Sequence, residues 1–168
     1  MIGILDVDYR NDHARAACVL INSWADSSPA ATYIADVNEV HPYEPGRFYL
    51  RELPCLMAVV RLLPVNPEIL VVDGYVWLGA DRRPGLGAYL HAATGNTAVA
   101  GIAKTKFRGM SGSQLMALVY RGQARNPLYV TAVGLGLNEV ASGVGGMHGT
   151  YRIPDMVRLT DHLARSTG

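Results

Sequence analysis

Three acidic residues lie within or at the ends of apolar segments, where an unpaired carboxylate is unfavourable. Asp6 interrupts the first apolar run, Asp73 ends an unbroken apolar run, and Glu52 lies among leucines in the first turn of a predicted helix. A carboxylate in such surroundings is costly unless it is paired or bound to a metal ion. If the two runs are neighbouring strands, the three acids form a cluster of oxygen ligands at one sheet edge. Such a cluster suits Mg²⁺ or Mn²⁺ better than zinc.

Lys104 ends the next apolar run along the chain and is therefore expected near the same edge. Its ammonium group can neutralise charge on a reacting phosphate. For each acid alone, a helix cap, a turn or a salt bridge is the ordinary explanation, and that alternative stays open. The four residues together, each at the end of an apolar element, favour a metal site for phosphate chemistry.

Hydrophobic patterning predicts the elements that would position these residues. Three strands joined by short polar links are typical of an antiparallel meander, and helices then alternate with buried strands. The predicted strands are 2–9, 15–21, 32–40, 69–74, 97–103, 115–120 and 128–133, the last two forming a hairpin, and the predicted helices are 48–63, 85–93, 138–144 and 155–165. This order predicts a single α/β domain over residues 1–168 with a mixed sheet.

The net charge of +1 is distributed unevenly along the chain. Residues 1–52 carry four basic and eight acidic side chains, a net charge of −4, whereas the remainder carries 11 basic and six acidic ones, a net charge of +5. Seven bases and no acid occur from Arg82 to Asn138. Acids that hold a cation and bases that hold flanking phosphates fit a metal-dependent enzyme acting on a phosphate polymer. Surface charge dispersed over several faces is the alternative.

Five short motifs follow one another along nearly the whole chain. They are Asp-Val-Asp-Tyr at 6–9, Pro-Tyr-Glu-Pro-Gly-Arg-Phe-Tyr-Leu-Arg-Glu at 42–52, Pro-Glu-Ile-Leu-Val-Val-Asp-Gly at 67–74, Gly-Ile-Ala-Lys-Thr-Lys-Phe at 101–107, and Tyr-Arg-Ile-Pro at 151–154 followed by Arg158-Leu159. Together they resemble the motifs of the endonuclease V family, which comprises ribonuclease H-like nucleases that recognise deaminated adenine. The resemblance is to a short and diverged member.

The resemblance implies a fold and a set of metal ligands. The fold would be ribonuclease H-like, with a mixed central sheet of an antiparallel meander and parallel strands, flanked by helices. Asp6, Glu52 and Asp73 would bind a catalytic Mg²⁺, for which Mn²⁺ would substitute, and Lys104 would contact the scissile phosphate. Asp161 falls where the family has a His or Asp near the metal and is a fourth candidate ligand. The metal would activate a water and stabilise the leaving oxygen.

The resemblance also implies which residues would hold a base flipped out of the nucleic acid. The residues that match the wedge loop, which fills the gap left by the base, are Tyr43, Pro45 and Gly46. The residues that match the lining of the base pocket are Phe48, Gly74, Gly85, Leu86 and Phe107. Extrusion is cheapest for a base in an already weakened pair. Glycines in the lining let backbone groups approach the base closely.

Several positions near the expected pocket depart from the family motifs. Val76 stands in place of a second glycine after the Asp-Gly pair, Ala80-Asp81-Arg82 in place of His-Pro-Arg, and Ala88-Tyr89 in place of Ser-His. The candidate metal ligands are unaffected. The changes therefore concern the pocket and the surface that holds the strand.

The expected function is that of a Mg²⁺-dependent endonuclease, a hydrolase of nucleic-acid repair that cleaves a phosphodiester bond 3′ to a deaminated adenine and leaves a 5′-phosphate. The expected partner is DNA containing deoxyinosine, with inosine-containing RNA as the alternative, and the expected state is a monomer. One alternative function is a diverged protein of the same fold that binds or cuts nucleic acid without inosine selectivity, or does not cut. Another is an unrelated α/β enzyme for a phosphorylated small molecule.

Cysteine usage and hydropathy bear on location. Cys18 and Cys55 lie in apolar runs without Cys-x-x-Cys spacing, which is typical of buried thiols in a reducing compartment. No apolar run approaches the roughly 20 residues of a membrane span, and the N-terminus lacks a signal-peptide pattern. We therefore expect a soluble, cytoplasmic protein without a membrane partner.

Overall fold

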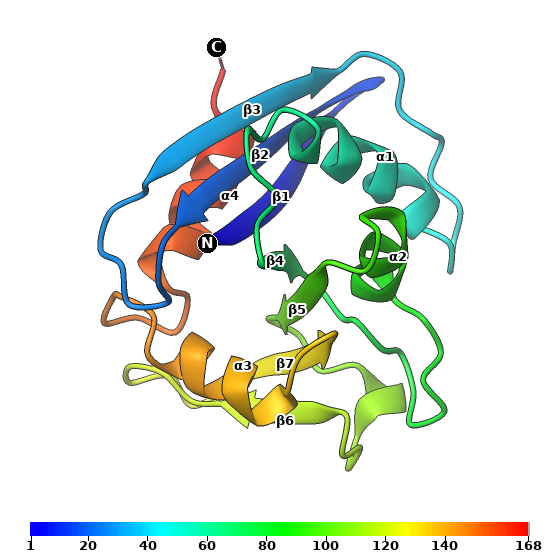
Figure 1. Cartoon of the computed structure of the whole chain (residues 1–168). Coiled ribbons are helices and arrows are strands. Elements are labelled where there is room, and N and C mark those ends of the chain that lie inside the picture. The colour runs from blue at the N-terminus through cyan, green and yellow to red at the C-terminus, as the bar shows by residue number, and fades with distance from the viewer. Residues whose placement is uncertain (168) are drawn as a thin grey trace.

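A mixed seven-stranded sheet runs through the structure, a computed structural model that describes residues 1–167 (Figure 1). The strands are β1 (Ile2–Arg10), β2 (His13–Ile21), β3 (Ala31–Val37), β4 (Ile69–Asp73), β5 (Ala98–Ala103), β6 (Met116–Val119) and β7 (Leu128–Val133), in the spatial order β3-β2-β1-β4-β5-β7-β6. The first three strands form the predicted antiparallel meander, and β4 and β5 run parallel to β1. The antiparallel pair β7 and β6 completes the sheet.

Helices cover both faces of this sheet (Figure 1). The helices are α1 (Tyr49–Val60), α2 (Leu86–Ala93), α3 (Leu137–Gly145) and α4 (Asp155–Arg165), with a short 3₁₀ helix, η1 (Arg108–Met110). Successive side chains of a strand point to opposite faces. In β1, Ile4 therefore packs into the core under α3 and α4, while Leu5 packs into the core under α1 and α2. The central strands read as continuous apolar runs because both of their faces are covered.

The predicted elements are all present, and the differences lie at their ends. The third strand ends at Val37 rather than at residue 40, and the first helix ends at Val60 rather than at 63. Val40 and Leu63 still pack against the core under α1, so the hydrophobic pattern continues beyond the regular elements. Pro64 also disfavours helical backbone at the residue before it. The three-residue η1 was not predicted because it is too short to show a periodicity.

In the described chain the longest helix, α1, has 12 residues, and no helix is both long and apolar enough to cross a membrane. The parallel strands β4 and β5 end at one edge of the sheet, and the pairing of β1 with β4 stops at the same level, although β1 itself continues to Arg10. Side chains at these three points are thereby brought together.

Candidate active site

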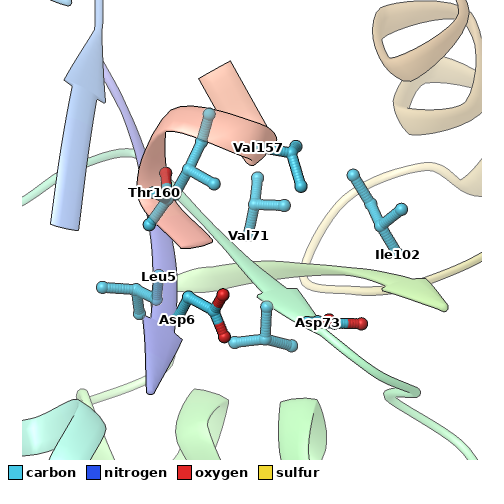
Figure 2. A pocket seen from close by; sticks show the side chains of 9 residues that line it. Leu5, Asp6, Val71, Asp73, Ile102, Val157 and Thr160 are labelled. Carbon is cyan, nitrogen blue, oxygen red and sulfur yellow. The ribbon is translucent and has the colours of Figure 1, made fainter. Parts of the chain in front are cut away.

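Asp6 and Asp73 lie at this edge on neighbouring strands. The parallel pairing of β1 with β4 runs as far as Leu5 and Val72, so the next residue of each strand is one of the two acids. Figure 2 shows Asp6 extending from β1 toward β4, whereas the carboxylate of Asp73 points away from it, toward the side of β5. Both acids line a small cavity that is also lined by Val157 and Thr160 of α4.

The carboxyl group of Asp6 is held in surroundings that disfavour its charge. Burial is the main reason that its pKa rises to about 6, and the negative charges of Asp73 and Asp161 act in the same direction. The backbone N–H of Val7 donates a hydrogen bond of 2.8 Å to Oδ1 of Asp6 and opposes this shift. Asp161, on α4, is therefore close enough to belong to the same acidic group.

Glu52 approaches this group from the other face of the sheet, in the first turn of α1. Burial raises the pKa of Glu52 to about 8, with further contributions from the charges of Asp6 and Asp73. Neither Glu52 nor Asp6 forms an ion pair with any residue of the described chain. These two carboxylates are therefore the ones that a bound cation would stabilise most.

The other two acids have basic partners. Nζ of Lys104, just beyond β5, donates a hydrogen bond of 2.6 Å to Oδ2 of Asp73, and each side chain is more than a third exposed. Nε of Arg165 donates a hydrogen bond of 2.9 Å to Oδ1 of Asp161 within α4. Lys104 thus lies beside the acids and remains open to a ligand.

A hard divalent cation fits this donor set, because the donors are carboxylate oxygens and two of them have pKa values raised by burial and like charge. As the side chains lie, no three acids, histidines or cysteines of residues 1–167 come close enough to form a complete metal cage. Two features account for the separation. The carboxylates of Asp6 and Asp73 diverge, and Lys104 takes up one oxygen of Asp73. The four predicted ligands therefore lie in one region of the fold, but their carboxylates do not form a closed metal site among the described residues.

A larger cavity, of about 490 Å³, lies beside the N-termini of α1 and α2. It is lined by Gly46, Arg47, Phe48, Tyr49, Leu78, Arg83, Pro84, Gly85, Leu86, Tyr89 and Phe107. Four residues expected to line a base pocket, Phe48, Gly85, Leu86 and Phe107, are thus on one cavity, together with Gly46 of the expected wedge loop. A side chain at Gly85 would place its Cβ 2.5 Å from the carbonyl oxygen of Tyr75, so only glycine fits there.

The remaining expected substrate residues lie elsewhere. Gly74 does not line this cavity; its backbone N–H donates to the carbonyl of Ile102 at the end of β4, and its φ of +141° favours glycine. Tyr43 is 62 % exposed, and Pro45 is also exposed, in the loop before α1. The loop is therefore free to contact a ligand next to the cavity that its own Gly46 helps to line.

Two features of the cavity wall were not predicted. The rings of Tyr49 and Tyr89 stack with centroids 3.8 Å apart and planes 9° from parallel, which joins α1 to α2. The hydroxyl of Tyr75 donates to the carbonyl of Thr105 at 2.7 Å and accepts the backbone N–H of Phe107 at 3.0 Å. Both contacts join residues that are far apart in the sequence, so no local spacing indicates them.

Comparison with known proteins places this fold and site in context. Residues 1–162 match the family model described as Endonuclease V. An endonuclease V of Xanthomonas oryzae pv. oryzae is 30% identical over 190 residues, covering 97% of this chain and 75% of that relative. The solved structure of endonuclease V from Streptomyces avermitilis has a TM-score of 0.75 and 26% identity, covering 98% of this chain and 79% of the other.

A further solved structure extends the comparison of the fold. Endonuclease V of Ciona intestinalis, in complex with a 23mer DNA containing an inosine followed by a ribo-adenosine, has a TM-score of 0.82 at 20% identity, covering 98% of this chain and 83% of the other. The mixed sheet flanked by helices is accordingly a ribonuclease H-like fold, as the motifs implied. The chain belongs to the endonuclease V family.

Proposed function

We propose that this protein is a Mg²⁺-dependent endonuclease that cleaves a phosphodiester bond 3′ to a deaminated adenine in nucleic acid and leaves a 5′-phosphate. The observation that carries the proposal is the placement of Asp6 and Asp73 on neighbouring strands, directly after the last paired residues of β1 and β4, with Nζ of Lys104 2.6 Å from Oδ2 of Asp73. Membership of the endonuclease V family supports nuclease activity. The complex named for the Ciona relative supports DNA containing inosine as the substrate.

The residues that would hold the metal are Asp6, Glu52, Asp73 and Asp161. A bound Mg²⁺ supplies an activated water and stabilises the leaving oxygen. Nζ of Lys104 is the positive group beside Asp73 that an incoming phosphate meets. When Lys104 turns to a phosphate oxygen, Oδ2 of Asp73 loses its hydrogen bond and becomes available as a ligand oxygen. Lys104 therefore serves both to hold the phosphate and to free a carboxylate.

The cavity beside α1 and α2 is the proposed base pocket. The rings of Phe48 and Phe107 and the side chain of Leu86 give it apolar walls against which a base can pack. Backbone at Gly85 can approach the base edge because no side chain intervenes. The exposed Tyr43 lies in the adjoining loop and is the proposed wedge that occupies the space of the flipped base.

A cleavage assay on labelled strands tests this proposal. The strands carry one inosine or none, as DNA and as RNA, and are incubated with Mg²⁺, with Mn²⁺ or with EDTA. Nicking that requires inosine and metal supports the proposal, and the DNA and RNA arms identify the substrate. The Asp73→Asn protein should not nick, whereas the control Asp12→Asn, at an exposed turn residue, should nick as the wild type does.

The same assay separates the alternative function. Tyr89 forms part of the cavity wall, so this departure from the family motifs alters the surroundings of the base, whereas Val76 is completely buried and does not line the cavity. Binding without nicking, or nicking that ignores inosine, would favour a diverged nucleic-acid-binding or nuclease-like protein. Size-exclusion chromatography tests the monomer that we propose.

A further inference from the structure

A third cavity, of about 720 Å³, lies beside the N-terminus of α4 and shares no lining residue with the proposed base pocket. We call it the Tyr151 groove. It is lined by Gln123, Ala124, Thr150, Tyr151, Arg152, Ile153 and Arg158. Its walls come from two loops, one after β6 and one after α3, and from the first turns of α4. None of these residues takes part in the proposed cleavage.

The two loops are held firmly against each other. Arg121 is buried, and its guanidinium donates hydrogen bonds of 2.9 Å to the carbonyls of Val144 and Gly145 and of 3.0 Å to that of Gly149. Gly122 has a φ of +59°, and a side chain there would collide with the carbonyl of Thr150. The groove is therefore a preformed feature of the fold rather than a gap between mobile loops.

An aromatic ring and a guanidinium are presented together in this groove. Tyr151 is 66 % exposed, and Cζ of Arg158 lies 5.4 Å from the centroid of its ring. Asp155 holds Arg158 at 3.8 Å and is itself paired with His148 at 3.0 Å. The acid of this region is thus engaged. The Arg158 guanidinium lies over one face of the tyrosine ring, and most of the side chain is still exposed to a ligand. An exposed ring beside a basic side chain is the usual platform on which an unpaired base stacks.

The groove is connected directly to the candidate active site. The guanidinium of Arg152, the next residue after Tyr151, donates hydrogen bonds to the carbonyl of Lys104 and, at 2.7 Å, to that of Pro127. Arg152 thereby fixes Tyr151 close to the strand end that carries Lys104. A nucleic-acid strand whose phosphate lies at Lys104 would have a neighbouring nucleotide within reach of the groove.

We infer that the Tyr151 groove binds one unpaired nucleotide that flanks the cleavage position on the same strand. Its base stacks on Tyr151, and its phosphate is held by Arg158. This inference rests on the proposed function for the position of the strand, but the stacking can be measured by binding alone. The lining has two arginines and no acidic residue, and together with the exposed ring of Tyr151 it favours a nucleotide over an apolar protein partner.

Fluorescence anisotropy with single-stranded DNA tests the inference. Each strand carries one inosine and one abasic site, and the abasic site moves stepwise along both sides of the inosine; the buffer contains EDTA and little salt. With the wild type, one abasic position should weaken binding by about tenfold, the loss of one stacked base. Tyr151→Ala should weaken binding of the intact strand by the same factor and show no further loss at that position. Tyr151→Phe, which keeps the ring, should bind as the wild type does.

The basic side of the groove is tested by salt dependence. Arg158→Gln should reduce the slope of log affinity against log salt concentration by about 0.7, the value for one phosphate contact on a single strand. Arg61→Gln, at an exposed residue that ends α1 on the other face of the sheet, is the matched control and should leave the slope unchanged. An equal change in both variants would overturn the inference, because the effect would then be one of net charge.

The inference also fails if Tyr151→Ala binds every strand as tightly as the wild type. It fails too if the affinity lost through Tyr151→Ala and the affinity lost through the abasic site add up at every position of the abasic site. Failure of the proposed function looks different. In that case the wild type would not nick inosine strands with Mg²⁺, while the abasic pattern and its dependence on Tyr151 would still be seen. Conversely, Tyr151→Ala and Arg158→Gln could both nick inosine strands and bind them with unchanged affinity. That result would support the proposed function and show that the groove takes no part in substrate binding.

Discussion

Replacing Glu52 by glutamine should stabilise the metal-free protein at neutral pH while removing a candidate metal ligand. The pKa of Glu52 rises from its ordinary value of 4.5 to about 8, mainly through burial and further through the charges of Asp6 and Asp73. A group whose pKa is higher in the folded state contributes stability that is fully present below its unfolded pKa and lost as the pH rises through its folded pKa. The loss therefore falls between about pH 4.5 and pH 8. Glutamine does not ionise, so the Glu52→Gln protein does not lose this stability as the pH rises.

The size of the effect follows from these two pKa values. At pH 7 the shift corresponds to a loss of about 3 kcal/mol in the free energy of unfolding. Part of the gain is offset, because the amide of glutamine must also be accommodated in the same partly buried place. We therefore expect Glu52→Gln to be more stable by about 1–3 kcal/mol at pH 7, a rise in Tm of about 3–10 °C for a chain of this length.

Thermal unfolding followed by circular dichroism in EDTA, at pH 4.5 and at pH 7, measures this effect. The difference between variant and wild type should be small at pH 4.5 and large at pH 7. The control Glu39→Gln, at an exposed position after β3, should differ from the wild type at neither pH. Added Mg²⁺ should raise the Tm of the wild type more than that of the variant. A variant that is no more stable at pH 7, or that gains equally at both pH values, would refute the reasoning.

Three further substitutions test the site and the cavity wall. Lys104→Met should lower kcat for nicking by about 100-fold with little change in substrate affinity, because the phosphate loses its cation; single-turnover assays would contradict this if only affinity fell. Tyr75→Phe removes the hydroxyl that accepts the backbone N–H of Phe107 at 3.0 Å. Because Phe107 lines the proposed base pocket, the variant should raise KM about tenfold in steady-state kinetics. An unchanged KM would show that the Tyr75 hydroxyl does not position Phe107. Tyr89→Leu removes the stack with Tyr49 and should lower the free energy of unfolding in urea by about 1 kcal/mol. It should also reduce the preference for inosine-containing strands in competition assays. An unchanged free energy of unfolding would show that the stack contributes nothing to stability.

Most of the fold could be predicted because the buried strands carry a strong pattern. β1 and β4 are covered on both faces, so each is a continuous apolar run that ends where an acid appears. The ends of elements were predicted less well, since hydrophobic packing continues where regular hydrogen bonding stops. Val40 and Leu63 illustrate this, as both pack against the core from outside a strand or helix.

The sequence predicted where the residues of the candidate site lie along the strands, but not how their side chains are oriented. Asp6 and Asp73 could be placed at one level of the sheet because each is the first acid after an apolar run and the two runs pair in parallel, and Lys104 because it follows the next strand. The divergence of the two carboxylates could not be foreseen, because it depends on side-chain orientation and on the 2.6 Å bond that Lys104 makes to Asp73. The stacked tyrosines and the Tyr151 groove depend on contacts between distant segments, which leave no spacing signal.

The uneven distribution of charge along the chain has a structural consequence at this site. Residues 1–52 have twice as many acids as bases, and none of their four bases forms an ion pair with Asp6 or Glu52, the two candidate ligands of this segment, although the charge of Arg51 opposes the rise in the pKa of Glu52. Their contacts are Arg10 with Asp8, Arg15 with Asp36, Arg47 with Glu44, and Arg51 over the ring of Tyr9. Asp73 and Asp161, from the basic remainder of the chain, do have partners. The excess of acid in this segment thus leaves two partly buried carboxylates with raised pKa values and no ion-pair partner, which is the arrangement that a divalent cation would stabilise most.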